Sequence, residues 1–120
     1  MGEVVEGWKM FAELANQNEA AKKLMQGWDK VVQFVVEGED PKEFYLEFKG
    51  GQVTFNVGKH PSPAFTMIGN KDIMWKLLTR EEDPTRAFMA KKYSIQGSLA
   101  DAMKFGKIGQ EVAKSAPSFG

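Results

Sequence analysis

The sequence contains no cysteine and a single histidine, His60. The absence of thiols excludes disulfides, thiolate nucleophiles and thiolate metal ligands. One histidine cannot supply the several ligands that transition-metal sites usually need, so we expect no metal site. His60 stands between Lys59 and Pro61, in a segment rich in loop-forming residues. We therefore interpret it as a solvated loop residue rather than a general base.

The chain also lacks an excess of charge of either sign. Sixteen lysines and arginines balance sixteen aspartates and glutamates, so the net charge is zero. Affinity for nucleic acid depends largely on cationic side chains that neutralise phosphates, and we therefore expect no nucleic-acid partner. The cluster Lys91-Lys92-Tyr93 is basic and aromatic, but a single such cluster on a neutral chain is typical of a solvated strand entry.

Long apolar runs are missing as well. No stretch approaches the roughly 20 apolar residues that span a bilayer. The acidic N-terminus, Met1 to Glu6, lacks the basic and apolar regions of a signal peptide. We expect a cytoplasmic protein with one domain, 1–120, because 120 residues suit a single core.

Motifs that carry catalysis are absent from the sequence. It has no His-Glu-x-x-His, no Gly-x-Ser-x-Gly, no phosphate loop and no Gly-x-Gly-x-x-Gly. The acidic run Glu81-Glu82-Asp83 stands where a helix begins, and interaction with the helix dipole explains it. We predict no catalytic residue, no cofactor and no enzymatic activity. An enzyme acting on hydrophobic substrates is a rival interpretation, because paired carboxylates meet in space rather than in sequence.

Apolar residues in the first 28 positions recur at helical spacing. Positions 4, 8, 11 and 15 predict one amphipathic helix, and 21, 24, 25 and 28 predict a second, shorter one. Asn16 followed by Glu19 resembles a capping box for the second helix.

The middle of the chain alternates as strands do. Residues 30–37 are rich in β-branched side chains, and apolar residues alternate with polar ones over 44–48 and 53–57. Gly50-Gly51 between the last two segments predicts a hairpin, because a type I′ turn needs positive φ at both central positions. A fourth strand begins at Phe65.

The last third of the chain returns to helices around one short strand. Asn70, Asp83 and Ser98 each precede a helical pattern and are good N-cap residues, and Pro84 suits the first helical position. The short strand covers 93–96. Consecutive strands with tight turns imply an antiparallel sheet, and helices before and after it imply an α+β fold with one face covered.

The segment from about Phe44 to Ile108 resembles the sterol carrier protein-2 family in the order and spacing of short motifs. After a hairpin, the family shows an apolar Thr-Met strand, a helix with two leucines and an Asx-Pro turn. An Ala-Phe-Met helix start, a Lys-rich strand ending in glycine and a final helix with Ala-Met-Lys follow. These motifs read here Phe65-Thr66-Met67, Leu77-Leu78, Asp83-Pro84, Ala87-Phe88-Met89, Lys92 to Gly97 and Ala102-Met103-Lys104.

The resemblance implies a five-stranded, mainly antiparallel sheet covered by helices, with an apolar tunnel between sheet and helices. Family members bind fatty acids, fatty acyl-CoA, sterols or phospholipids, and some transfer them between membranes. We therefore expect a carrier of a lipid-like hydrophobic ligand, and leave transient membrane contact and the oligomeric state open. The residues expected to line the tunnel are Phe44, Leu46, Phe55, Phe65, Met67, Met74, Leu78, Phe88, Met89, Met103 and Phe105.

Methionine is abundant, at seven residues in 120. Its flexible, polarizable side chain suits cavities that accept varied apolar shapes, and it also fills gaps in ordinary cores. For Met67, Met74, Met89 and Met103 we keep both interpretations.

An interaction or dimerisation module with a collapsed cavity is the alternative function. Trp8, Trp28 and Trp75 would then be interface anchors, whereas in a carrier they would be core residues. Gly106 and Gly109 in the last helix also admit two interpretations, because helix-weakening glycines suit both a movable gate over the cavity and close helix packing.

Overall fold

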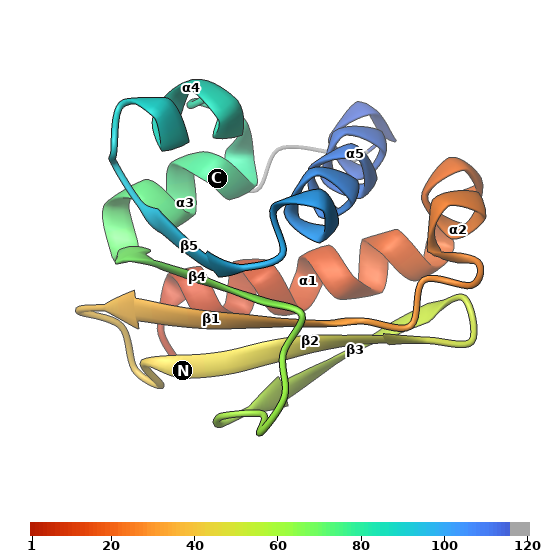
Figure 1. Cartoon of the computed structure of the whole chain (residues 1–120), viewed down its shortest axis with the longest axis horizontal. Helices are drawn as coiled ribbons and strands as arrows, with labels where there is room; N and C mark the ends of the chain where they lie inside the picture. The colour runs from red at the N-terminus through yellow and green to blue at the C-terminus, as the bar shows by residue number, and fades with distance from the viewer. Residues whose placement is uncertain (116–120) are drawn as a thin grey trace.

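A computed structural model describes residues 1–115. Residues 116–120, which the single-domain expectation included, lie outside the described part of the chain. The elements are α1 (Glu3–Gln17), α2 (Glu19–Met25), β1 (Val31–Glu37), β2 (Glu43–Lys49), β3 (Gln52–Val57), β4 (Phe65–Asn70), α3 (Lys71–Thr79), α4 (Pro84–Met89), β5 (Ser94–Gly97) and α5 (Leu99–Ser115). The five strands form one sheet and the helices lie on one side of it (Figure 1), which confirms the predicted α+β class.

The strands are ordered β3-β2-β1-β4-β5. Three neighbouring pairs are antiparallel, as predicted, but β4 pairs with β1 in parallel, with Phe65 opposite Val32 and Met67 opposite Phe34. The sequence pattern does not predict the parallel pair. Its physical basis is the segment after β3, which carries the chain back to β1 instead of turning tightly onto the next strand.

The side chain of Gln33 attaches the segment between β3 and β4 to the sheet. It is the one buried polar side chain of β1, at 2% exposure. Its Nε2 donates to the carbonyls of Phe44 and Gly58, each at 3.0 Å, and its Oε1 accepts from the His60 N–H at 2.8 Å. Because side chains alternate along a strand, Gln33 points away from the helix-covered face. His60 therefore lies in a loop on the outer side of the sheet.

The core lies between the helices and the inner face of the sheet. Phe44, Leu46 and Phe48 of β2 are buried, while the residues between them are partly exposed, as the alternation predicted. Phe34 of β1 stacks on Phe44 with ring centroids 4.8 Å apart. Apolar burial of this kind contributes roughly 25 cal/mol per Å² to folding. It also fixes the register of β2, because a one-residue slip would turn the apolar side chains of this strand to its outer face.

Local signals set most element ends. The side-chain oxygens of Asn70, Asp83 and Ser98 accept backbone N–H groups at 2.9, 2.9 and 3.1 Å, so each caps its helix as predicted. Gly50 and Gly51 have φ of 62° and 76°, the signs that a type I′ turn requires.

The predicted capping role of Asn16 is wrong. Asn18 caps α2 instead, accepting the Ala21 N–H at 2.8 Å. The Asn16 side chain is engaged elsewhere: its Oδ1 accepts the Val53 N–H and its Nδ2 donates to the Val53 carbonyl, both at 2.8 Å. Asn16 thereby pairs with the free edge of β3 as a further strand residue would.

Replacing Asn16 by alanine should lower the free energy of unfolding by about 1–2 kcal/mol, since both hydrogen bonds are lost and the edge of β3 is left to water. Urea unfolding measures the change. Asn56→Ala is the matched control, because the Asn56 amide bonds only to Thr54 of its own strand. Equal stability of the two variants would contradict the role assigned to Asn16.

Candidate functional site

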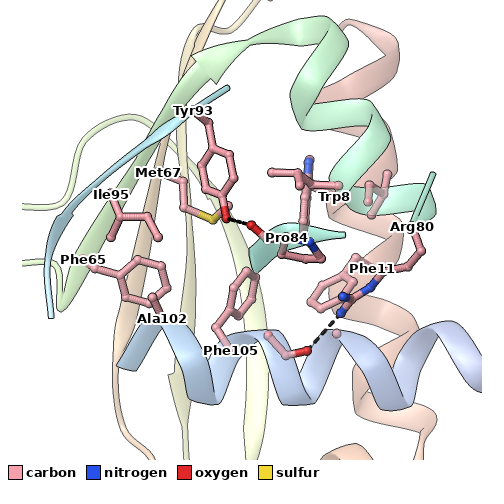
Figure 2. Close-up of a pocket in the computed structure, with 14 residues that line it drawn as sticks. Trp8, Phe11, Phe65, Met67, Arg80, Pro84, Tyr93, Ile95, Ala102 and Phe105 are labelled. Atoms are coloured by element: carbon pink, nitrogen blue, oxygen red, sulfur yellow. Dashed lines mark hydrogen bonds between the residues drawn. The ribbon is translucent and has the colours of Figure 1, made fainter. Parts of the chain in front are cut away.

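A small apolar space, here called the chamber, lies between the inner face of β4 and β5 and the helices. Its volume is about 50 Å³. Figure 2 shows its walls, which come from α1, α3, α5, both strands and the start of α4. The lining residues are Trp8, Phe11, Phe65, Met67, Leu77, Leu78, Arg80, Pro84, Tyr93, Ile95, Ala102, Phe105, Gly106 and Gly109.

A larger space, here called the groove, adjoins the chamber. It has a volume of about 830 Å³ and is bordered mainly by α4, β5 and α5. Its lining residues are Arg80, Asp83, Pro84, Thr85, Phe88, Tyr93, Ile95, Leu99, Ala102, Met103, Gly106, Lys107, Gln110, Ala113 and Lys114. Chamber and groove share Arg80, Pro84, Tyr93, Ile95, Ala102 and Gly106, so these residues mark the junction between the two.

Six of the eleven residues expected to line a tunnel border these spaces. Phe65, Met67, Leu78 and Phe105 line the chamber, and Phe88 and Met103 line the groove. That any of the eleven contacts a ligand stays a prediction.

The other five border neither space. Phe44, Leu46 and Met74 are fully buried in the core, Phe55 is partly buried on β3, and Met89 is 75% exposed. For Phe44, Leu46 and Phe55 the reason lies in the strand order: β2 and β3 lie on one side of β1, whereas chamber and groove lie beside β4 and β5, on its other side. Met74 on α3 is enclosed in the core, and Met89 at the end of α4 is exposed. The alternation of apolar and polar residues predicts which side chains of a strand are buried, but not whether that strand lies beside a cavity.

The chamber wall contains one charged side chain, that of Arg80. This residue follows α3 and has φ 66° and ψ 20°, in the left-handed region. Its Nη2 donates to the Gly106 carbonyl of α5 at 2.9 Å, and Figure 2 shows this hydrogen bond crossing from α3 to α5. Burial lowers the pKa of the Arg80 guanidinium, while the negative charge of Asp83 opposes the shift.

Tyr93 lies at the same junction. Its hydroxyl donates to the Pro84 carbonyl at 2.8 Å, which ties the start of α4 to the chain just before β5 (Figure 2). Burial raises the pKa of Tyr93 to about 12; the charge of Asp83 raises it further and that of Arg80 lowers it. The expectation that Lys91-Lys92-Tyr93 is solvated fits the two lysines but not the tyrosine, which is 7% exposed.

The tryptophans lie mostly inside the molecule. Trp8 and Trp28 are buried, and the Trp28 Nε1 donates to Asp101 at 3.0 Å. Trp75 is partly buried. Trp8 lines the chamber, and its buried Nε1–H has no hydrogen-bond acceptor among residues 1–115. Leaving a buried donor unpaired has an energetic cost.

The two glycines of α5 differ in their surroundings. A Cβ at Gly106 would meet no atom within 4 Å, so this glycine leaves open space at the junction. A Cβ at Gly109 would stand 2.6 Å from the Arg80 Nη2 and 3.7 Å from Phe11. Gly109 therefore allows α5 to pack closely against Arg80 and Phe11. That α5 moves as a gate over the cavity stays a prediction.

The sequence pattern did not predict that Arg80 borders both chamber and groove. The only available signal was a cation at the end of an amphipathic helix, which interaction with the helix dipole explains equally well. Its place in the chamber wall depends on α5, which lies about 20 positions further along the chain.

Two further structural findings concern residues 1–115. In this part of the chain, no three histidine, aspartate or glutamate side chains gather closely enough to hold a metal ion. None of the described helices has the length and apolar content needed to cross a membrane.

Comparison with known proteins identifies a family over most of the chain. The model of the SCP-2 sterol transfer family matches residues 11–110. The hydroxysteroid dehydrogenase-like protein 2 of Xenopus tropicalis is 36% identical over 100 residues, which cover 81% of this chain and 23% of that protein. The chain thus spans about a quarter of this longer relative.

Solved structures share the fold. The sterol carrier protein domain 2 of Helicoverpa armigera superposes with a TM-score of 0.68 at 24% identity, over 97% of this chain and 92% of that one. Sterol carrier protein 2 from Yarrowia lipolytica, in its apo form, gives 0.68 at 15% identity, over 93% and 91%. Both similarities concern the fold.

Tyr93 should make stability depend on pH in the alkaline range. The pKa of a tyrosine in the unfolded chain is ~10, whereas burial raises the pKa of Tyr93 to about 12 in the folded state, so the unfolded state loses the proton first. The contribution of Tyr93 to the free energy of unfolding is therefore complete below pH ~10. Between pH ~10 and ~12 the free energy of unfolding should fall by roughly 1–2 kcal/mol. Urea unfolding of wild type and Tyr93→Phe from pH 8 to 12 isolates this loss, because every other group titrates in both. Parallel stability curves would refute it.

Proposed function

The chain belongs to the SCP-2 sterol transfer family, and on this premise we propose that it binds and carries a lipid-like hydrophobic molecule in the chamber and groove. The observation that carries the proposal is a groove of about 830 Å³ that continues into an apolar chamber. Ligand sites typically measure roughly 300–1,000 Å³ and have mostly apolar walls.

The energetics favour an aliphatic ligand. Each methylene group moved from water to an apolar wall gains ~0.8 kcal/mol. Leu99 and Met103 of α5 border the groove with 53% and 69% exposure, so they offer apolar surface that a ligand would cover. Part of this gain is offset by the ordering of ligand and side chains.

The rival functions have less support. An interaction module would need its tryptophans at the surface, and Trp8 and Trp28 are buried. The relative whose name suggests a dehydrogenase is about four times longer than the part that matches this chain, so its name does not assign a catalytic activity to this part. We propose carriage without catalysis for the part that this chain represents.

Native mass spectrometry and lipid extraction of the purified protein test the proposal. We expect co-purified lipid in wild type and at least tenfold less in Met103→Asp, because a carboxylate in the groove wall must be desolvated when the ligand binds. Met10→Asp is the matched control: Met10 is 49% exposed on α1 and borders neither space.

If Met103→Asp and Met10→Asp retain equal amounts of lipid, the lipid binds outside the groove. Protein free of lipid that also fails to bind added lipids would argue against carriage altogether. Met103 and Met10 are both exposed, so neither change should affect the fold.

Alanine substitutions at Gly106 and Gly109 distinguish a role in ligand access from a role in the packing of α5. Gly106→Ala should raise stability by up to ~1 kcal/mol through helix propensity and slow ligand exchange, because the methyl group stands at the junction. Gly109→Ala should be less stable than Gly106→Ala by about 1 kcal/mol, since Arg80 must leave its hydrogen bond. Thermal unfolding and stopped-flow exchange measure both. Unchanged exchange in Gly106→Ala would exclude passage of the ligand past this point.

A further inference from the structure

The side chain of Arg80 stands where chamber and groove meet, and a single hydrogen bond keeps it there. Its guanidinium donates to the Gly106 carbonyl at 2.9 Å, which occupies one of its five N–H donors, and it forms no ion pair within residues 1–115. Figure 2 shows the side chain reaching from the end of α3 to α5. The other residues shared by the two spaces have shorter or more rigid side chains; they are Pro84, Tyr93, Ile95, Ala102 and Gly106.

Two glycines of α5 make room for the guanidinium. A Cβ at Gly109 would stand 2.6 Å from the Arg80 Nη2, so a larger residue there would displace the guanidinium from its present position. A Cβ at Gly106 would meet no atom within 4 Å, so the space beside the accepting carbonyl is open. The end of a flexible side chain leaves such a position by rotation about its own bonds, without movement of either helix.

The groove offers the guanidinium a second position. Asp83 borders the groove but not the chamber, and one of its carboxylate oxygens caps α4 while the other has no hydrogen-bond partner in the described chain. The two acids between Arg80 and Asp83 border neither space: Glu81 is exposed, and Glu82 pairs with Lys92. A guanidinium that turns into the groove regains water and approaches a carboxylate, which relieves the cost of burying its charge.

We propose that the Arg80 side chain is a gate between groove and chamber. In the closed position its guanidinium donates to the Gly106 carbonyl, and in the open position it lies in the groove while the apolar end of a ligand enters the chamber. The chamber alone, at about 50 Å³, is far below the roughly 300 Å³ of a small ligand site, so it contributes to binding only when joined to the groove. This inference rests on the proposed function and adds a regulation of the same site, by one side chain rather than by movement of α5.

Fluorescence of Trp8 measures occupancy of the chamber, because Trp8 lines the chamber and not the groove. The probe is ω-bromododecanol, an uncharged chain whose terminal bromine quenches an indole at short range. Dodecanol without bromine is the control for effects other than quenching. The part of the quenching that disappears in Trp8→Phe is the chamber signal, and we expect this signal in wild type.

Two variants open the gate in different ways. Arg80→Gly removes it at a position whose φ of 66° glycine adopts freely, and Gly109→Ala displaces the guanidinium but keeps its charge. Because apparent affinity falls in proportion to the fraction of molecules that are closed to the ligand, we expect at least about fivefold tighter binding in each variant, from titration of the Trp8 signal. Lys91→Gly, with φ 61° outside both spaces, is the matched control and should bind as wild type does.

Each other outcome overturns the gate. Unchanged or weaker binding in Arg80→Gly would show that the side chain does not obstruct the chamber. Tighter binding in only one of the two variants would assign the effect to charge or to packing, and quenching that Trp8→Phe does not reduce would place the end of the probe outside the chamber. In these cases lipid detected by native mass spectrometry would leave carriage standing. If wild type binds no ω-bromododecanol and holds no lipid after purification, the proposed function fails and the gate fails with it.

Discussion

The position of α5 depends on the packing of one ring, Phe105, on the inner face of the sheet. Its centroid lies 5.6–6.2 Å from five other aromatic rings, which come from α1, β1, β2 and β4. These rings belong to Trp8, Phe11, Phe34, Phe48 and Phe65. Because α5 forms a wall of both chamber and groove, this cluster fixes the distance at which that wall stands from the sheet.

Polar contacts are concentrated where the two spaces meet. Arg80 bonds to the α5 carbonyl of Gly106, and Tyr93 bonds to the carbonyl of Pro84. Both hydrogen bonds join segments that are adjacent only in the folded molecule. The junction of chamber and groove thus combines apolar walls with the guanidinium of Arg80 and the hydroxyl of Tyr93.

Interactions between neighbours in sequence made much of the fold predictable. The caps at Asn70, Asp83 and Ser98 depend on side chains that accept an N–H three residues further on. The Gly50-Gly51 turn depends on the positive φ of its own two glycines. Asn16 shows the limit of this reasoning. It is as good a cap residue as Asn18, but its amide is taken by the edge of β3, 37 positions away.

The sequence by itself determined the α+β class, the alternation of buried residues in β2 and the apolar face of α5, because these depend on side-chain periodicity. Only the tertiary structure decided that β4 pairs with β1 in parallel, and that Met67 borders the chamber while Met74 is enclosed in the core. It also decided that Arg80 faces α5. The physical reason is that the edge or space an apolar residue reaches depends on strand order and on long-range partners, which local spacing does not encode.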